Sequence, residues 1–443
     1  EASSGGQRGW VRLETTFTKD LPARNQPLRV GDASTRPGMW GRSVYFGGVQ
    51  WGTNFGMLPG FITQPLPVLS GVSSAPSTVE LYVNDVLRQV STIPTGPFAI
   101  DNFPALTGGG DARLVVRDLL GRETVITQSF FTSSELLAKG LNDWSVEAGV
   151  LRFDLGAENN VYRHGFASGL WRRGVSNGLT LETRAEASRE SRNLGLGGVL
   201  ALPLHILGKG AIAVSDHRDL GRGRQWMLGI ERQTLRTGSY LQAQGASSGF
   251  RQLGQDVRAA PTRLQVAGNF SYATERWGSF GVGFASVRRV DAERLLTLSA
   301  NYSVRVGKGS SLTVSASRAT SGASGSSVGV TLVVPLQGNR VTSASVLSRQ
   351  GQQDFYATAA QNPTLDNSLA WRTLGGRQQG QTRAEAGVYY TGRYGSVSGD
   401  LSASSRNSAL RLGATGGVIV ADGHLFATRR LDGSFALAEV AGY

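Results

Sequence analysis

Apolar and polar residues alternate with a period of two along most of this chain, and one stretch, residues 77–134, breaks the pattern. In the segment 179–187, the charged residues Glu182, Arg184 and Glu186 fall on one face of an expected strand, and leucines and alanines fall on the other. The same alternation recurs at 263–272, 296–305, 312–316 and 397–403. Alternation sustained over so many segments predicts a large antiparallel sheet with one charged face and one face of small apolar residues.

The composition narrows the environment of such a sheet. Charged residues make up 17% of the 443 residues, below the roughly 25% of ordinary soluble domains, and there are 60 glycines and no cysteine. Transmembrane barrels have this composition because their outward positions are apolar and their inward positions polar. Glycine-rich extracellular solenoids share it. No segment approaches the ~20 apolar residues of a membrane helix, so a membrane location would require a closed barrel.

The charge distribution argues against nucleic acid as a partner. The net charge is +13, but the basic residues are scattered along the chain, singly or in pairs, with no run of five or more. A nucleic-acid binder needs clustered basic residues with interleaved aromatic residues. Two interpretations of the excess arginine stay open. In the first, the excess reflects only the codon usage of a GC-rich genome. In the second, the arginines line a lumen or bind the phosphates of lipopolysaccharide, which arginine contacts bidentately.

The interrupting stretch is predicted to fold by itself. Short strands are expected within residues 77–134, separated by turn residues, with a spacing that suits a small immunoglobulin-like β-sandwich; these strands are 79–83, 88–93, 113–117 and 124–128. The rest of the chain suffices for about two dozen strands, which would enclose a lumen on the order of 30 Å wide. A lumen of that width would leak. We therefore expect the insert, which is slightly acidic inside a basic chain, to be a plug.

Several segments, in this order along the chain, resemble the fimbrial outer-membrane ushers of the chaperone–usher pathway. They are Arg29-Val30-Gly31-Asp32-Ala33, Phe46-Gly47-Gly48-Val49-Gln50-Trp51, Pro59-Gly60-Phe61, Gln64-Pro65-Leu66-Pro67, Gly96-Pro97-Phe98, Val115-Val116-Arg117-Asp118, Gly121-Arg122-Glu123, Leu136-Leu137 and Gly433-Ser434-Phe435-Ala436-Leu437. Many members carry an Arg-Asp pair near the position of Thr53-Asn54. Its absence leaves the subfamily open and favours the archaic branch.

The resemblance implies a fold and a function. It implies a large transmembrane antiparallel β-barrel with an inserted plug, in the outer membrane of a Gram-negative bacterium. It also implies a gated channel that translocates folded pilus subunits, delivered as periplasmic chaperone–subunit complexes, and supports fibre assembly at the cell surface. Outer-membrane lipid and lipopolysaccharide would be further partners. Whether two ushers associate is left open.

The expected domain boundaries follow from the insert and the resemblance. Residues 1–70 are expected to form the first barrel strands, and residues 77–134 the plug, with linkers at about 65–76 and 135–140. Residues 141–432 would form the remaining barrel strands. Residues 433–443 would begin a linker to a C-terminal domain. Full-length ushers also have periplasmic N- and C-terminal domains, so we expect this chain to be the translocation unit alone.

The candidate functional residues are charges, and no enzyme is predicted. None of the four histidines has the spacing of a zinc motif or of a catalytic triad, and no nucleotide or cofactor site is visible. Lumen-facing candidates are Glu182, Arg184 and Glu186. Ion pairs from the plug turn are expected to hold the plug shut, with solvated side chains or pairs within one element as the alternative; the plug candidates are Arg117, Asp118, Arg122 and Glu123.

A second class of function also fits the composition. A secreted or surface-anchored Gly/Ser-rich β adhesin would have a similar residue content. It would show a fixed repeat of roughly 20–30 residues, whereas the strand and turn spacing here shows no such repeat. It would also stay soluble without detergent.

Overall fold

The computed structural model describes most of the chain with short gaps, and all structural statements below concern the described residues. These are residues 12–58, 60–64, 69–73, 77–83, 86–93, 96–100, 108–118, 123–155, 158, 160–234, 236–258, 262–290, 293–307, 309–320, 325–362, 368–378, 380–421 and 423–429. The expected linker start at 433–443 lies outside them. Two compact units are distinguished: the first holds β1 to β16 and most of β17, the second holds β19 to β29, and β18 is shared.

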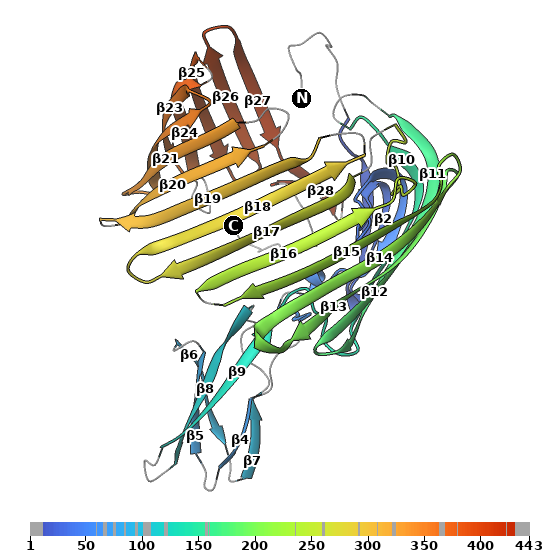
Figure 1. Ribbon diagram of the computed structural model, residues 1–443, viewed down its shortest axis with the longest axis vertical. Helices are drawn as coiled ribbons and strands as arrows, with labels where there is room; N and C mark the ends of the chain where they lie inside the picture. The colour runs from blue at the N-terminus through green and yellow to red at the C-terminus, as the bar shows by residue number, and fades with distance from the viewer. Residues whose placement is uncertain are drawn as a thin grey trace. The chain divides into compact units, whose positions relative to one another are not determined.

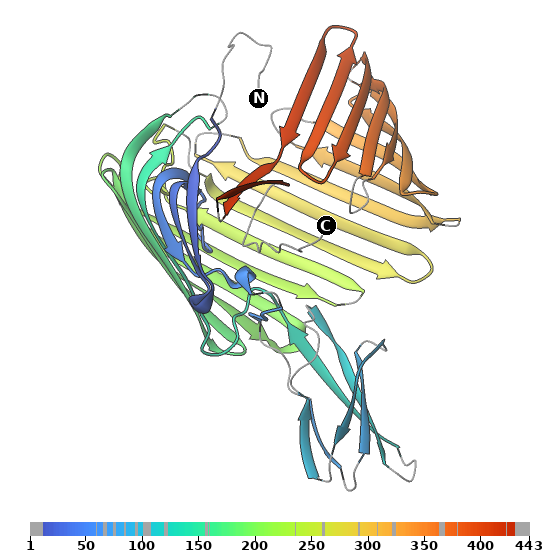
Figure 2. The ribbon, with the colours of Figure 1, turned by 180° about the vertical axis from the view of Figure 1, so that it is seen from behind.

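The first unit contains a continuous antiparallel run of long strands (Figure 1). In order of pairing they are β1 (Thr16–Leu21), β2 (Gln26–Ser34), β3 (Tyr45–Gly52), β10 (Asn142–Arg152), β11 (Tyr162–Ser176), β12 (Leu179–Ser188), β13 (Ser191–Leu202), β14 (Ile206–His217), β15 (Gly221–Gln233), β16 (Thr237–Ala246) and β17 (Thr262–Thr274). Strand β3 pairs directly with β10, so the sheet continues past the insert as if it were absent (Figure 2). Three short 3-10 helices join strands: η1 (Pro22–Arg24), η2 (Phe55–Met57) and η3 (Pro203–His205).

The insert forms two small sheets that are separate from the large one. One pairs β4 (Leu69–Ser73) with β7 (Gly96–Ile100). The other has the order β6-β5-β8-β9, with bounds β5 (Ser77–Val83), β6 (Val86–Ile93), β8 (Gly108–Asp118) and β9 (Glu123–Thr132). Val79 and Leu81 alternate on β5 and are buried together with Leu114 and Val116 of β8. This alternation gives the insert an apolar core of its own.

The second unit continues the antiparallel pattern. Its strands are β19 (Leu295–Val306), β20 (Ser310–Ala319), β21 (Gly325–Leu336), β22 (Arg340–Arg349), β23 (Gln352–Gln361), β24 (Ser368–Gln378), β25 (Gln381–Thr391), β26 (Ser396–Ser404) and β27 (Ser408–Thr415). Strands β28 (Gly417–Ala421) and β29 (His424–Thr428) form a separate hairpin. With β18 (Gly278–Arg289), the strands of the large sheet number 21 among the described residues. No described helix is long and apolar enough to cross a membrane.

The large sheet of the first unit reverses the usual placement of polar and apolar side chains. On β12, Glu182, Arg184 and Glu186 are buried, whereas Leu181, Ala185 and Ala187 on the opposite face are exposed. Leucine, isoleucine and valine side chains of β13 to β15 are likewise exposed, namely Leu194, Leu196, Ile212, Val214, Leu228 and Ile230. A sheet with an apolar outer face and a polar inner face matches a wall that faces lipid.

Apolar packing inside the first unit comes from connections that cover the polar face. One cluster joins Trp40, from the β2–β3 connection, to Ala211, Ala213 and Met227 of the sheet and to Phe250. A second joins Val44, Phe46, Leu151, Phe166 and Leu253. A third joins Leu136, which follows the insert, to Val199 and Leu207. The core therefore lies between the sheet and three connections.

Candidate functional site: a buried charge network on the inner face

Three rows of side chains cross strands β10 to β13 on their inner face. The strand registers place the members of each row directly opposite one another: Asp143–Arg172–Glu182–Gly197, Ser145–Leu170–Arg184–Gly195 and Glu147–Ser168–Glu186–Asn193. Because side chains alternate along a strand, residues two positions apart on one strand lie on the same face. They therefore belong to neighbouring rows and bring these rows side by side. The polar residues of four strands thereby form one continuous patch, and directly opposite residues are close enough to interact.

The first row is a chain of ion pairs. Arg172 Nη1 lies 3.6 Å from Asp143 Oδ2, and its Nε lies 3.4 Å from Glu182 Oε2. Arg36, from the β2–β3 connection, contributes a shorter contact of 2.6 Å from its Nη2 to Asp143 Oδ2. Thr53 Oγ1 donates to Asp143 Oδ1 at 2.5 Å. The two carboxylates of this row are thus shared between two guanidinium groups.

The second and third rows hold the most deeply buried pair. Arg184 has 0% exposed surface, and its Nη2 and Nε lie 2.8 Å and 2.9 Å from Glu186 Oε1. Asn193 Nδ2 donates to Glu186 Oε2 at 2.9 Å. Glu147 accepts from Ser168 Oγ at 2.6 Å and from Ser145 Oγ at 2.8 Å. A buried charge is tolerated only when it is paired and hydrogen-bonded, and these contacts meet that condition.

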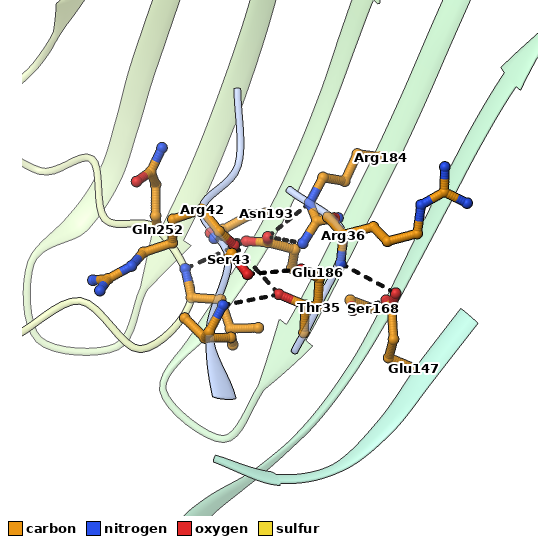
Figure 3. Close-up of polar contacts among 12 residues, drawn as sticks. Thr35, Arg36, Arg42, Ser43, Glu147, Ser168, Arg184, Glu186, Asn193 and Gln252 are labelled. Atoms are coloured by element: carbon orange, nitrogen blue, oxygen red, sulfur yellow. Dashed lines mark hydrogen bonds and ion pairs between the residues drawn. The ribbon is translucent and has the colours of Figure 1, made fainter. Parts of the chain in front are cut away.

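Residues 35–44, the β2–β3 connection, fold over this patch (Figure 3). The loop closes on itself, because the Thr35 amide donates to Val44 O at 2.9 Å and the Val44 amide donates to Thr35 Oγ1 at 3.1 Å. Its backbone is bound by the rows beneath it: the Met39 amide donates to Glu182 Oε1 at 2.6 Å, and Arg184 Nη1 donates to Arg36 O. The charged patch therefore serves as a seat for residues 35–44.

A second connection, between β16 and β17, is hydrogen-bonded both to residues 35–44 and to the charged patch. Gln252 Nε2 donates to Trp40 O at 2.5 Å, and the Leu253 amide donates to Glu186 Oε2 at 3.3 Å. Glu186 thus binds its own strand neighbour Arg184, the next strand, and a residue 67 positions away in the sequence. The two connections and the sheet form one hydrogen-bonded body within the first unit.

A separate cluster ties the start of the described chain to the sheet. Asp32 on β2 accepts from Arg12 Nη1 at 2.5 Å and lies 3.1 Å from Arg152 Nη1. The Tyr162 hydroxyl also donates to Asp32, and the Thr15 amide does so at 2.8 Å. Arg12 precedes β1, and its hydrogen bond to Asp32 raises the pKa of its guanidinium. This cluster anchors residues 12–15 beside β2.

The sequence-predicted residues fare differently. Glu182, Arg184 and Glu186 are brought together on one face, but they are covered by residues 35–44 rather than open to solvent. That they face a lumen stays a prediction. Of the plug candidates, Arg117 of β8 and Glu123 of β9 are directly opposite in register, and Asp118 ends β8 opposite Ser77. Arg122 lies outside the described residues.

Sequence reasoning missed four charged members of the network: Arg36, Asp143, Glu147 and Arg172. A signal existed for two of them, since Asp143, Ser145 and Glu147 show the same i, i+2, i+4 polar pattern as the residues of β12. Arg36 carried no such signal because it lies in a connection. Asp216 and His217, the one Asp-His neighbour pair of the sequence, end β14 on opposite faces, the first exposed and the second buried.

Comparison with known proteins gives a consistent family. The sequence profile described as outer membrane usher protein matches residues 1–443. The chain is 28% identical over 201 residues to the outer membrane usher protein FasD of Escherichia coli, covering 45% of this chain and 24% of FasD. It is 21% identical over 477 residues to the F1 capsule-anchoring protein of Yersinia pestis, covering 98% of this chain and 56% of that protein. The chain thus spans at most about half the length of these relatives.

Solved structures show the same fold. The translocation pore of the P pilus usher PapC matches with a TM-score of 0.54 and 18% identity, covering 91% of this chain and 85% of that one. A cryo-EM structure of an E. coli P pilus tip assembly intermediate, PapC-PapD-PapK-PapG, matches with a TM-score of 0.68 and 18% identity, covering 96% of this chain and 55% of that one. These similarities confirm the expected fold class, an all-β chain with the fold of an usher translocation pore.

Proposed function

Because the chain belongs to the outer membrane usher protein family, we propose that it forms the outer-membrane channel through which folded pilus subunits reach the cell surface. The observation that carries the proposal is the reversed sheet, whose exposed face is apolar and whose buried face is charged. The relatives support it, since FasD is named an outer membrane usher protein and PapC was solved together with PapD, PapK and PapG. By analogy, chaperone–subunit complexes are the partners we propose for this chain.

The division of labour along the chain is part of the proposal. Residues 1–70 and 141–432 would form the barrel wall, and residues 77–134 the plug, with linkers at about 65–76 and 135–140. Two of these bounds need correction: β4 (Leu69–Ser73) pairs with β7 and so belongs to the insert, and β28 and β29 form a hairpin outside the large sheet. The insert suits this role because it has its own buried core and because β3 pairs with β10 across it. A body that the wall does not need for its pairing can move without breaking the sheet.

The charged inner face would be the lumen side of the wall. In this proposal Glu182, Arg184 and Glu186 act by holding residues 35–44 against the wall, so that the loop narrows the lumen next to the plug. Ion pairs from Arg117, Asp118, Arg122 and Glu123 would hold the plug shut. No enzymatic step is assigned to any residue.

Single-channel conductance in a lipid bilayer tests this function. The parent chain should be quiet, and a variant lacking residues 77–134 should show a very large, steady conductance. If the parent chain and the deletion variant are both silent, or both show the same small pore, the insert is not a plug. A chain that remains soluble without detergent and never conducts would favour the β adhesin instead.

A single charge reversal gives a finer test of the plug contacts. Arg122→Glu should raise the leak of the intact chain if this residue helps to hold the plug. Arg218→Glu is the matched control, because Arg218 is an exposed arginine after β14, outside the insert. Equal leak in the two variants would exclude Arg122 from the gate and leave the deletion result unaffected.

A further inference from the structure

Part of the segment that follows the insert, residues 135–138, is bound tightly to the inner face of the large sheet. Leu136 and Leu137 are only 2% and 3% exposed, although they lie in a connection between β9 and β10. Leu136 packs against Val199 of β13 and Leu207 of β14. On the inner face, Val199 and Leu207 form a socket that Leu136 fills.

The backbone of the segment is also held by the wall. The Leu137 amide donates to Thr180 Oγ1 at 2.8 Å, and Thr180 itself is buried on β12. A Cβ atom at Gly174 of β11 would lie only 2.2 Å from Ala138 O. Glycine at 174 is therefore what lets the segment approach the sheet so closely.

Charge contacts complete the attachment. Lys209 of β14 lies 2.6 Å from Glu135 Oε1 and 2.9 Å from Glu231 Oε2, so one ammonium group joins the segment to two strands. Arg172 Nη2 of the first row of the charge network donates to Glu135 O at 3.0 Å. The Glu135 position is thus fixed through both its side chain and its carbonyl.

The two ends of the insert meet at this same place. The Ala138 amide donates to Thr63 O at 2.8 Å, which joins the chain just before the insert to the chain just after it. The insert therefore leaves and rejoins the wall at one point. Ser134, in contrast, is exposed.

We propose that Glu135, Leu136 and Lys209 form a fixed pivot for the insert: residues 135–138 stay bound to the wall whether the channel is closed or open. This inference rests on the proposed function, since it concerns how the plug moves. The displacement of the insert then leaves Thr63 and residues 135–138 in place. The three residues are positioning residues that fix where the plug can swing.

Cysteine accessibility tests the pivot directly, because the chain has no cysteine of its own. Full-length variants carrying Leu136→Cys, Leu137→Cys or Ser134→Cys would be placed in lipid vesicles and exposed to a membrane-impermeant maleimide. The reaction would be run at rest and at a membrane voltage that opens the channel in bilayer recordings. We expect the cysteines at 136 and 137 to react roughly tenfold slower than the cysteine at 134 in both states.

Two outcomes would overturn the proposal. If the cysteine at 136 reacts as fast as that at 134 at rest, the segment is not held by the wall. If it is protected at rest and reacts fast only in open channels, the segment is released on opening and is a latch rather than a pivot. Agreement between positions 136 and 137 guards against an effect of the reporter substitution itself.

Two matched substitutions assign the role of Lys209. In the Leu136→Cys background, Glu135→Gln should speed labelling about fivefold or more, because it removes the carboxylate that belongs to the segment. Glu231→Gln removes the other carboxylate from the same lysine but leaves the segment's own contact in place, so labelling should change less. Equal labelling rates in the two variants would show that the ion pair between Lys209 and Glu135 does not hold the pivot.

Failure of the pivot and failure of the proposed function are separable. Labelling at rest reports the attachment of residues 135–138 even if the insert closes nothing. If the cysteine at 136 is protected but deletion of residues 77–134 leaves the conductance unchanged, the attachment of residues 135–138 stands and the plug role of the insert is rejected. If the cysteine at 136 is reactive and the deletion gives a large conductance, the plug role of the insert stands and the pivot is rejected.

Discussion

The indole ring of Trp40 occupies the space that any side chain at position 195 would need. A Cβ atom at Gly195 would lie 2.4 Å from Nε1 of Trp40, which is closer than a real Cβ contact allows. Gly195 ends the row Ser145–Leu170–Arg184–Gly195, directly opposite the buried Arg184. Because Gly195 has no side chain, the wall has a notch at this position. Residues 35–44 are thus seated by shape as well as by charge.

Gly195→Ala should therefore displace Trp40 and loosen residues 35–44. We expect a loss of about 1–3 kcal/mol in the free energy of unfolding, the usual range for overpacking a tight site. Urea unfolding in detergent micelles, followed by tryptophan fluorescence, would measure it.

Gly229→Ala is the matched control for this substitution. Gly229 is also a buried glycine of the inner face, on β15, but a Cβ atom there would meet its neighbours at 3.7 Å or more, an ordinary contact distance. A similar loss at both positions would show that the notch at Gly195 has no special role.

Removing the carboxylate of Glu186 should be among the most damaging single changes in the first unit. Glu186→Ala leaves Arg184 fully buried without its counter-charge, and breaking such a pair costs about 3–5 kcal/mol. The double variant Arg184→Met, Glu186→Leu should recover part of that loss, since it removes both charges but leaves Arg36 O, Asn193 Nδ2 and the Leu253 amide without these partners. The same urea unfolding assay measures both, and a double variant as unstable as Glu186→Ala would contradict the explanation.

The second unit offers an exposed ion pair for contrast. Arg372 of β24 is 55% exposed at its side chain and lies 2.9 Å from Asp400 Oδ1 of β26, across β25. Because water screens such a pair, Arg372→Ala should cost less than about 1 kcal/mol. Asp400 keeps the hydrogen bond from Tyr389, so it is not left unpaired. A loss as large as that of Glu186→Ala would show that exposure does not set the energy of these pairs.

A charge placed on the apolar face should be costly if that face meets lipid. Leu196 of β13 is exposed beside Ile212 of β14, and Leu196→Lys should destabilise the chain in lipid vesicles by up to about 2–4 kcal/mol. Gln242→Lys, on the inner face of β16 opposite Gly229, is the control and should change little. Folding titrations in vesicles would measure both. Equal effects at the two positions would argue against a lipid-facing outer surface.

Much of the fold was accessible from sequence patterns. The two-residue turn at Asn177-Gly178 lies between β11 and β12 as its residues predict, and the alternation at 179–187 correctly placed Glu182, Arg184 and Glu186 on one face. The expected strands of residues 77–134 are present as β5, β6, β8 and β9. These successes share a cause: turn geometry and side-chain alternation depend only on residues a few positions apart.

The candidate site was accessible only in part. The pattern that flagged β12 also exists on β10, and a search for charges at i, i+2 and i+4 could have added Asp143 and Glu147. Arg36 could not be found in this way. It lies in a connection without periodicity, and its partner Asp143 is 107 positions away in the sequence.

The sequence by itself therefore determined which residues share a face of each strand, and so that the sheet has a charged side and an apolar side. Only the tertiary structure decided that Glu186 lies opposite Ser168 and Asn193, and that residues 35–44 cover the charges. The reason is range. Alternation is fixed by local backbone geometry, whereas strand register and the seating of a loop depend on contacts such as that between Met39 and Glu182, which are 143 positions apart.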